Sequence, residues 1–151
     1  MEIYLTKSPT QTKKLSQSLA KRILKLKASK KTIVLGLIGD LGGGKTTFLQ
    51  GFAKGLGIRE RVLSPTFVLM KRFSILKRSF IHIDCYRIKT PRELLNLGFK
   101  DLISDTRNII AIEWADKIKR IMPKNAFILE FKFIDKGTRK IVIKSNKWKI
   151  K

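Results

Sequence analysis

The sequence predicts one α/β domain with a mixed, mostly parallel central sheet, flanking helices and an antiparallel C-terminal hairpin. Three observations predict this class. The run 32–38 is almost wholly apolar, as expected of a strand buried on both faces of a sheet. Segment 9–27 repeats leucine and isoleucine at helical spacing. Segments 126–133 and 139–145 alternate apolar and polar residues around the turn at 135–138, which is typical of a hairpin.

The remaining elements follow from local signals. Ser8 to Gln11 and Thr90 to Glu93 both read as capping boxes with proline at the first helical position, so each predicts a helix start. Gly55 or Gly57 would end the helix that begins at Thr46. In order, we expect a helix over 9–27, a strand over 32–38, a helix over 46–55, strands over 67–73 and 79–84, a helix from Pro91 that stops at Gly98, a strand over 108–113, a short helix over 114–120, and strands over 126–133 and 139–145.

Length and composition predict a soluble cytoplasmic protein. The 151 residues, 43% of them hydrophobic, are enough for one packed domain over 1–151. No apolar run approaches the roughly 20 residues that span a bilayer, and the N-terminus lacks the pattern of a signal peptide. The lone Cys85 excludes an intramolecular disulfide, and there is no Cys/His cluster for zinc.

The charge is strongly positive, with 34 Lys and Arg against 11 Asp and Glu, a formal net charge of +23. Such an excess favours polyanions such as RNA or nucleotides. The lysines are nevertheless spread along the chain and accompany abundant isoleucine, which also fits a genome-wide codon preference. A solvated or partner-docking surface is therefore favoured over a specific RNA-binding face, and composition leaves both open.

A glycine-rich loop is the first segment whose sequence indicates a chemical function. Gly39 to Thr46 fits G-x-x-x-x-G-K-[ST], the Walker A pattern, and it stands between a predicted buried strand and a predicted helix, as this pattern requires. Glycines let backbone N–H groups point inward around phosphate oxygens, and the helix adds its own unpaired N–H groups. Lys45 would reach the β- and γ-phosphates, and the Thr46 hydroxyl would complete a Mg²⁺ shell. The loop predicts binding of a nucleoside triphosphate.

Two carboxylates stand where a metal partner is expected, at the ends of other core strands. Asp84 ends the strand over 79–84, and Glu113 ends the strand over 108–113. The residues alone do not choose between them. His82, the lone histidine, shares a strand face with Asp84 and would either orient that carboxylate or be an ordinary hydrogen-bonded core histidine; the second is favoured.

Five motifs in order resemble the TsaE (YjeE) family, small P-loop ATPases of bacterial tRNA threonylcarbamoyladenosine biosynthesis. They cover the chain from about Ser8 to Arg139 and are specific as a set, although a P-loop alone is generic. The matching segments are Gly39-Asp40-Leu41-Gly42-Gly43-Gly44-Lys45-Thr46-Thr47, Ser64-Pro65-Thr66-Phe67, His82-Ile83-Asp84-Cys85-Tyr86-Arg87, Glu93-Leu94 to Gly98, and Ile112-Glu113-Trp114-Ala115.

The resemblance implies roles for individual residues. Thr46 and Glu113 would hold Mg²⁺, Asp84 and Lys45 would act in hydrolysis, and Thr66 would sense the γ-phosphate. The nucleotide, ATP or ADP, would be bound by Ser8, Gln11, Thr12, Asp40, Leu41, Gly42, Gly43, Gly44, Lys45, Thr46, Thr47, Trp114 and Arg139. The chain departs from the common family pattern in having Ser16 for glycine, Gly43 for alanine and Asp116 for glutamate, and only the first of these weakens an inference, that of the adenine contacts.

The resemblance also implies partners. The family's ATPase docks on a TsaB–TsaD complex, with TsaC upstream supplying the threonylcarbamoyl-adenylate, so we expect weak ATP hydrolysis that the partners stimulate. Contact with tRNA would be indirect, and no membrane is involved.

Two other functions fit the phosphate loop. A small-molecule P-loop kinase could recruit Arg87 and Arg92, although the sequence has no obvious lid segment. A basic RNA-binding module could use ATP only structurally, but its aromatic residues fit sheet positions better than an exposed stacking platform.

Overall fold

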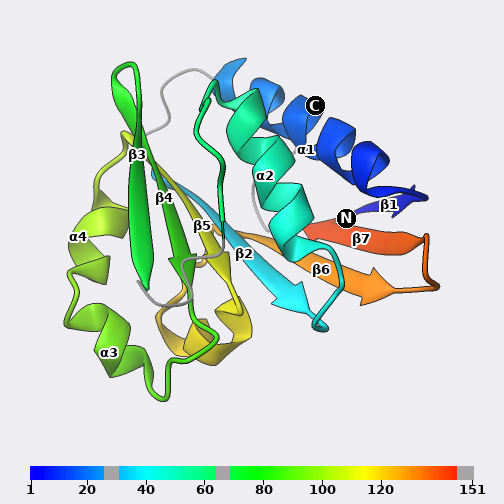
Figure 1. Ribbon diagram of the computed structural model, residues 1–151. Coiled ribbons are helices and arrows are strands. Elements are labelled where there is room, and N and C mark those ends of the chain that lie inside the picture. Colours follow the sequence, from blue (N-terminus) through cyan, green and yellow to red (C-terminus); the bar gives the residue numbers. More distant parts are fainter. Residues whose placement is uncertain (26–30, 64–68, 146–151) are drawn as a thin grey trace.

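The protein is built on a seven-stranded sheet with the strand order β1-β7-β6-β2-β5-β4-β3 (Figure 1). The computed structural model describes residues 1–25, 31–63 and 69–145. The strands are β1 (Glu2–Thr6), β2 (Ile33–Gly39), β3 (Met70–Ile75), β4 (Arg78–Asp84), β5 (Asn108–Glu113), β6 (Phe127–Phe133) and β7 (Arg139–Lys144).

The centre of the sheet is parallel and its margins are antiparallel. β2 pairs in parallel with β5 and β6, and β5 pairs in parallel with β4. The antiparallel pairs are β1–β7, β6–β7 and β3–β4, so β7 and β3 alone oppose the other five of the seven strands. The predicted mixed, mostly parallel sheet with a C-terminal hairpin is thus confirmed.

Helices cover both faces of this sheet. α1 (Pro9–Lys25) and α2 (Lys45–Gly55) lie side by side across one face (Figure 1). The other face packs against α3 (Pro91–Leu95), α4 (Phe99–Ser104) and the 3₁₀ helix η1 (Ala115–Ile121). Neighbouring residues of β2 point to opposite faces, Val34 to the second set of helices and Leu35 to the first. Within the described ranges, no helix is long and apolar enough to cross a bilayer.

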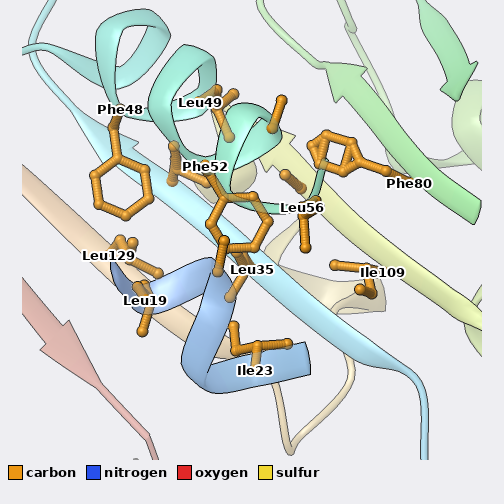
Figure 2. Packing of buried hydrophobic residues seen from close by; sticks show 14 of the residues in the cluster. Leu19, Ile23, Leu35, Phe48, Leu49, Phe52, Leu56, Phe80, Ile109 and Leu129 are labelled. Carbon is orange, nitrogen blue, oxygen red and sulfur yellow. The ribbon is translucent and has the colours of Figure 1, made fainter. Parts of the chain in front are cut away.

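The larger of the two cores fills the space between α1, α2 and the sheet, and Figure 2 shows its centre. α1 contributes Leu19 and Ile23, and Phe52 of α2 points between them and the sheet. Figure 2 also labels Leu35, Phe48, Leu49, Leu56, Phe80, Ile109 and Leu129 in this cluster. Because this core fixes α2 against β2, it also fixes the loop that joins them.

The predicted capping box forms at the start of α3, and a related pair of hydrogen bonds forms at the start of α1. Ser8 Oγ accepts a hydrogen bond from Gln11 N at 3.1 Å, and the Gln11 side chain accepts one from Lys7 N at 2.7 Å. At α3, Glu93 Oε2 accepts from the backbone of Lys89 at 2.8 Å and more weakly from that of Thr90 at 3.4 Å. These hydrogen bonds give acceptors to backbone N–H groups at the starts of both helices that have no partner within the helix.

Three features differ from the sequence prediction. β1 and α4 were not predicted, and β1, rather than the C-terminal hairpin, forms that edge of the sheet. The predicted strand over 67–73 falls partly on residues 64–68, which lie outside the described part of the chain; in the described part the strand covers Met70–Ile75 and forms a tight hairpin with β4. The predicted helix start at Trp114 is occupied by a left-handed residue, with φ 57°, so η1 begins one residue later.

α1 and α2 approach each other closely because small residues form their contact. A β-carbon added at Gly51 would lie 2.2 Å from Ser16 Oγ and 2.5 Å from the Lys13 carbonyl oxygen. One added at Gly55 would lie 2.7 Å from the Gln17 carbonyl oxygen. All three distances are shorter than van der Waals contact, so a side chain at either glycine would push α1 away from α2.

This contact predicts that Gly51→Ala destabilises the protein by about 1–3 kcal/mol, because the new methyl group overpacks the helix seam. Helix propensity alone predicts the opposite, a gain of roughly 1 kcal/mol. Urea denaturation measures the difference. Lys54→Ala, an exposed position on the same helix, is the control and should stay within about 0.5 kcal/mol of the parent. A Gly51→Ala variant more stable than the parent would contradict the close packing.

Candidate functional site

The phosphate-loop motif connects β2 to α2, at the carboxyl end of the parallel part of the sheet. Its backbone has a positive φ at three glycines, Gly39, Gly42 and Gly44. Gly39 has φ 133°, and a β-carbon there would lie 2.2 Å from the Phe131 carbonyl oxygen. Gly44 precedes α2 with φ 98° in the left-handed region. The loop therefore turns sharply into the N-terminus of α2, where unpaired N–H groups favour an anion.

Lys45 lies buried inside the curl of this loop. Its ammonium group donates to the carbonyl oxygens of Gly39 at 2.7 Å and Asp40 at 2.8 Å. The same Nζ lies 4.4 Å from the centroid of the Trp114 ring. Burial lowers the pKa of Lys45, and the nearby Glu113 carboxylate opposes that change. The Lys45 ammonium is thus a positive charge whose neighbours are two loop carbonyl oxygens and the face of an aromatic ring.

The two candidate carboxylates are neighbours across β4 and β5. Asp84 and Glu113 are paired residues in the register of these parallel strands, and each is buried. Thr46 Oγ1 donates to Glu113 Oε1 at 3.2 Å, so the structure brings the predicted metal pair together. Asp84 Oδ1 accepts from the backbone N–H of Tyr86 at 2.9 Å. Glu113 therefore contacts the first turn of α2.

The donor set at Thr46 and Glu113 fits a hard cation that keeps other ligands. A hydroxyl and a carboxylate are oxygen donors of the kind that Mg²⁺ prefers. Within the described ranges no three His, Cys, Asp or Glu side chains form a metal-binding group. A closed protein cage such as zinc takes is thus excluded for this part of the chain, and Mg²⁺ here would draw further ligands from phosphate and water.

His82 lies beside Glu113 rather than serving Asp84. Its Nε2 is 2.9 Å from Glu113 Oε2, and both side chains are almost fully buried. Its other ring nitrogen, Nδ1, has no hydrogen-bond partner among the described residues. His82 is thus a buried, hydrogen-bonded histidine, as the sequence favoured, but the partner of its Nε2 is the Glu113 carboxylate.

Lys45, Thr46, Asp84 and Glu113 border one cavity of about 490 Å³. It brings together thirteen of the residues predicted from sequence: Ser8, Thr12, Leu41, Gly42, Gly43, Gly44, Lys45, Thr46, Thr47, Asp84, Glu113, Trp114 and Arg139. Gln11 and Asp40 do not line it, since the Gln11 side chain bonds to Lys7 N and Asp40 contributes its carbonyl oxygen to Lys45. Thr66 lies outside the described residues.

The cavity also has walls that sequence reasoning missed, namely Pro9, Tyr86, Lys136 and Gly137. Tyr86 follows Asp84 within a motif already singled out, and Pro9 follows Ser8, so local sequence could have indicated both. Lys136 and Gly137 come from the β6–β7 turn, which nothing in their own sequence links to the phosphate loop.

Arg139 ties that turn to the loop. Its Nε donates to the Gly42 carbonyl oxygen at 3.0 Å, and one terminal nitrogen donates to the carbonyl oxygens of Asp135 at 2.8 Å and Thr138 at 3.1 Å. The guanidinium carbon lies 4.4 Å from the Phe133 ring centroid. This side chain therefore braces the phosphate loop against the C-terminal hairpin, in addition to lining the cavity.

Comparison with known proteins agrees with these features. The family described as "Threonylcarbamoyl adenosine biosynthesis protein TsaE" matches residues 6–141. A protein of that name from Haemophilus influenzae is 36% identical over 77% of this chain and 72% of its own length. One from Bacillus subtilis is 38% identical over 80% of this chain and 76% of its own length.

A solved structure extends the likeness to the fold. The crystal structure of YdiB from Bacillus subtilis superposes with a TM-score of 0.76 at 28% identity, covering 95% of this chain and 84% of that one. The neighbour has a P-loop fold, which implies nucleotide binding. Because the family model matches residues 6–141, this chain belongs to the TsaE family.

Proposed function

We propose that this chain binds ATP with Mg²⁺ in the cavity at the phosphate loop and hydrolyses it slowly to ADP and phosphate. The observation that carries the proposal is the contact between Thr46 and Glu113, 3.2 Å apart, directly beside the buried Lys45. A hydroxyl, a carboxylate and an ammonium group converge there on the N-terminus of α2. This is the set of groups that a Mg²⁺–triphosphate needs.

Each residue has a separate part in this proposal. The loop N–H groups and Lys45 bind the β- and γ-phosphates, and Thr46 and Glu113 hold the metal, which neutralises charge on the phosphate oxygens. Asp84, held by the Tyr86 N–H at 2.9 Å, faces the same cavity and acts in hydrolysis. Ser8, Thr12, Trp114 and Arg139 surround the remainder of the nucleotide. Thr66 is assigned as a γ-phosphate sensor from the family resemblance alone.

We further propose that hydrolysis serves the threonylcarbamoyladenosine modification of tRNA. The relatives carry that biosynthesis in their names, and the chain matches them over most of its length. TsaB and TsaD are the proposed docking partners, TsaC acts upstream, and contact with tRNA is indirect. Such a role places the protein in the cytoplasm. A nucleotide-dependent change at the cavity would carry the signal to the partners.

Turnover of purified protein tests the reaction type. ATP should yield ADP and free phosphate in equal amounts, slowly, and candidate small-molecule acceptors should leave that ratio unchanged. A phosphorylated acceptor would instead establish the kinase alternative. For the RNA-binding alternative, tight and steeply salt-dependent tRNA binding that survives Lys45→Ala would be decisive. Phe73 and Phe80 are buried, which disfavours a stacking platform on those strands.

A further inference from the structure

His82 makes a contact that an ordinary core histidine does not need. It is fully buried in β4, and its hydrogen bond joins Nε2 to Glu113 Oε2 over 2.9 Å. From this contact we infer that His82 is a positioning residue: it holds the Glu113 carboxylate in the orientation that binds Mg²⁺. The inference rests on the proposed function, because it assigns a cause to the metal affinity of the same site.

The strand register places His82 close to the end of β5 that carries the Glu113 carboxylate. In the parallel pairing of β4 with β5, His82 stands opposite Ala111 and Asp84 stands opposite Glu113. His82 is therefore the diagonal neighbour of Glu113 on the same sheet face, beneath the carboxylate rather than beside it. Alanine at position 111 leaves room for the imidazole to extend along β5 toward Glu113.

Two hydrogen bonds then fix the plane of the carboxylate. Rotation about the last torsion of a glutamate side chain is soft, so one contact does not define where both oxygens point. Here Oε2 is bound by His82 at 2.9 Å, and Oε1 is bound by Thr46 Oγ1 at 3.2 Å. Without the imidazole, Oε2 would be a buried acceptor lacking that donor, and the carboxylate would turn to recover a partner.

The orphan nitrogen of His82 indicates which atom carries the proton. Nδ1 has no partner in the described part of the chain, and a buried N–H without an acceptor is costly, whereas a bare lone pair is less so. Nε2 therefore holds the hydrogen and donates it to Glu113. A histidine kept only for packing would be expected to satisfy both nitrogens, as most buried polar groups do.

Variants at His82 test the inference through metal binding, independently of turnover. Calorimetry measures the affinity for the nonhydrolysable β,γ-imido analogue of ATP. The measurement is made first with a chelator that removes Mg²⁺ and then at increasing Mg²⁺ concentrations, which gives the metal dependence of nucleotide binding. His82→Leu should weaken Mg²⁺ binding to the nucleotide complex by about 10–100-fold and leave metal-free nucleotide binding unchanged. His82→Gln, whose amide can donate from nearly the same place, should recover most of the loss.

Phe80→Leu is the matched control, since Phe80 lies two residues earlier on the same strand face and is equally buried. It should lower stability without changing the Mg²⁺ dependence. Wild-type Mg²⁺ dependence in His82→Leu would overturn the positioning role alone. A parent protein whose nucleotide binding ignores Mg²⁺ would overturn the proposed function and, with it, this inference.

The lone histidine also provides a spectroscopic test that needs no nucleotide. Since the chain has one His, long-range ¹H–¹⁵N NMR of the full-length protein reports its imidazole without assignment. We expect the tautomer with hydrogen on Nε2 and a shift of that signal in Glu113→Ala. Hydrogen on Nδ1, or a signal unaffected by Glu113→Ala, would overturn the inference even if His82→Leu failed to fold.

Discussion

Lys45→Ala is expected to reduce ATP turnover by at least about a hundredfold while leaving the fold intact, because it removes a preorganised charge beside the transferring phosphate. Lys45 is buried in the loop, and its ammonium is held by the carbonyl oxygens of Gly39 and Asp40 at 2.7 and 2.8 Å. The cavity has other cationic walls, Lys136 and Arg139, but these come from the hairpin and not from the start of α2.

Released phosphate measures this effect, and denaturation checks that the variant folds. Lys54→Ala removes an exposed lysine from the last turn of the same helix and should retain parental turnover. Unchanged turnover in Lys45→Ala would remove the assignment of the phosphate loop.

Alanine at the two strand-end acids should separate metal binding from chemistry. Glu113→Ala is expected to weaken Mg²⁺–nucleotide binding by about tenfold or more, because Thr46 loses the carboxylate 3.2 Å away. Asp84→Ala should bind Mg²⁺–nucleotide nearly as the parent does and turn it over about a hundredfold more slowly, the scale of a lost proton-transfer or water-orienting group. Calorimetry and single-turnover kinetics measure the two quantities separately.

Asp101→Ala, at an exposed acid on α4, controls for the loss of one negative charge from a very basic chain. If Glu113→Ala and Asp84→Ala both bind Mg²⁺–ATP normally, the division of roles between the two acids is wrong.

The parts of the fold that sequence predicted best are those whose signal is local. β5 has the bounds of its apolar run, Asn108–Glu113, and β2 differs from the predicted 32–38 by one residue at each end. Strands buried on both faces are mostly apolar, so a continuous apolar run indicates where such a strand lies. β1 is five residues long and depends on pairing with β7 from the far end of the chain, which no local pattern reports.

The residues of the candidate site were likewise predictable only where their sequence signal is local. The Walker A pattern alone indicated the loop and Lys45, since the glycines and the lysine act within one short segment. The residues could not rank Asp84 against Glu113, because both end core strands and register makes them neighbours. Side-chain geometry separates them: Thr46 and His82 each contact Glu113. The brace from Arg139 to Gly42 spans most of the chain and was equally beyond local reasoning.

Turnover in a reconstituted assembly tests the proposal that ATP hydrolysis by this chain serves a tRNA-modifying complex. ATP hydrolysis would be measured for the protein alone, then with TsaB and TsaD, and then with tRNA added, using Lys45→Ala in parallel to exclude turnover by the partners. We expect weak activity for the protein alone and clear stimulation in the complete assembly, and the variant should lack both. Equal rates with and without the partners would contradict it.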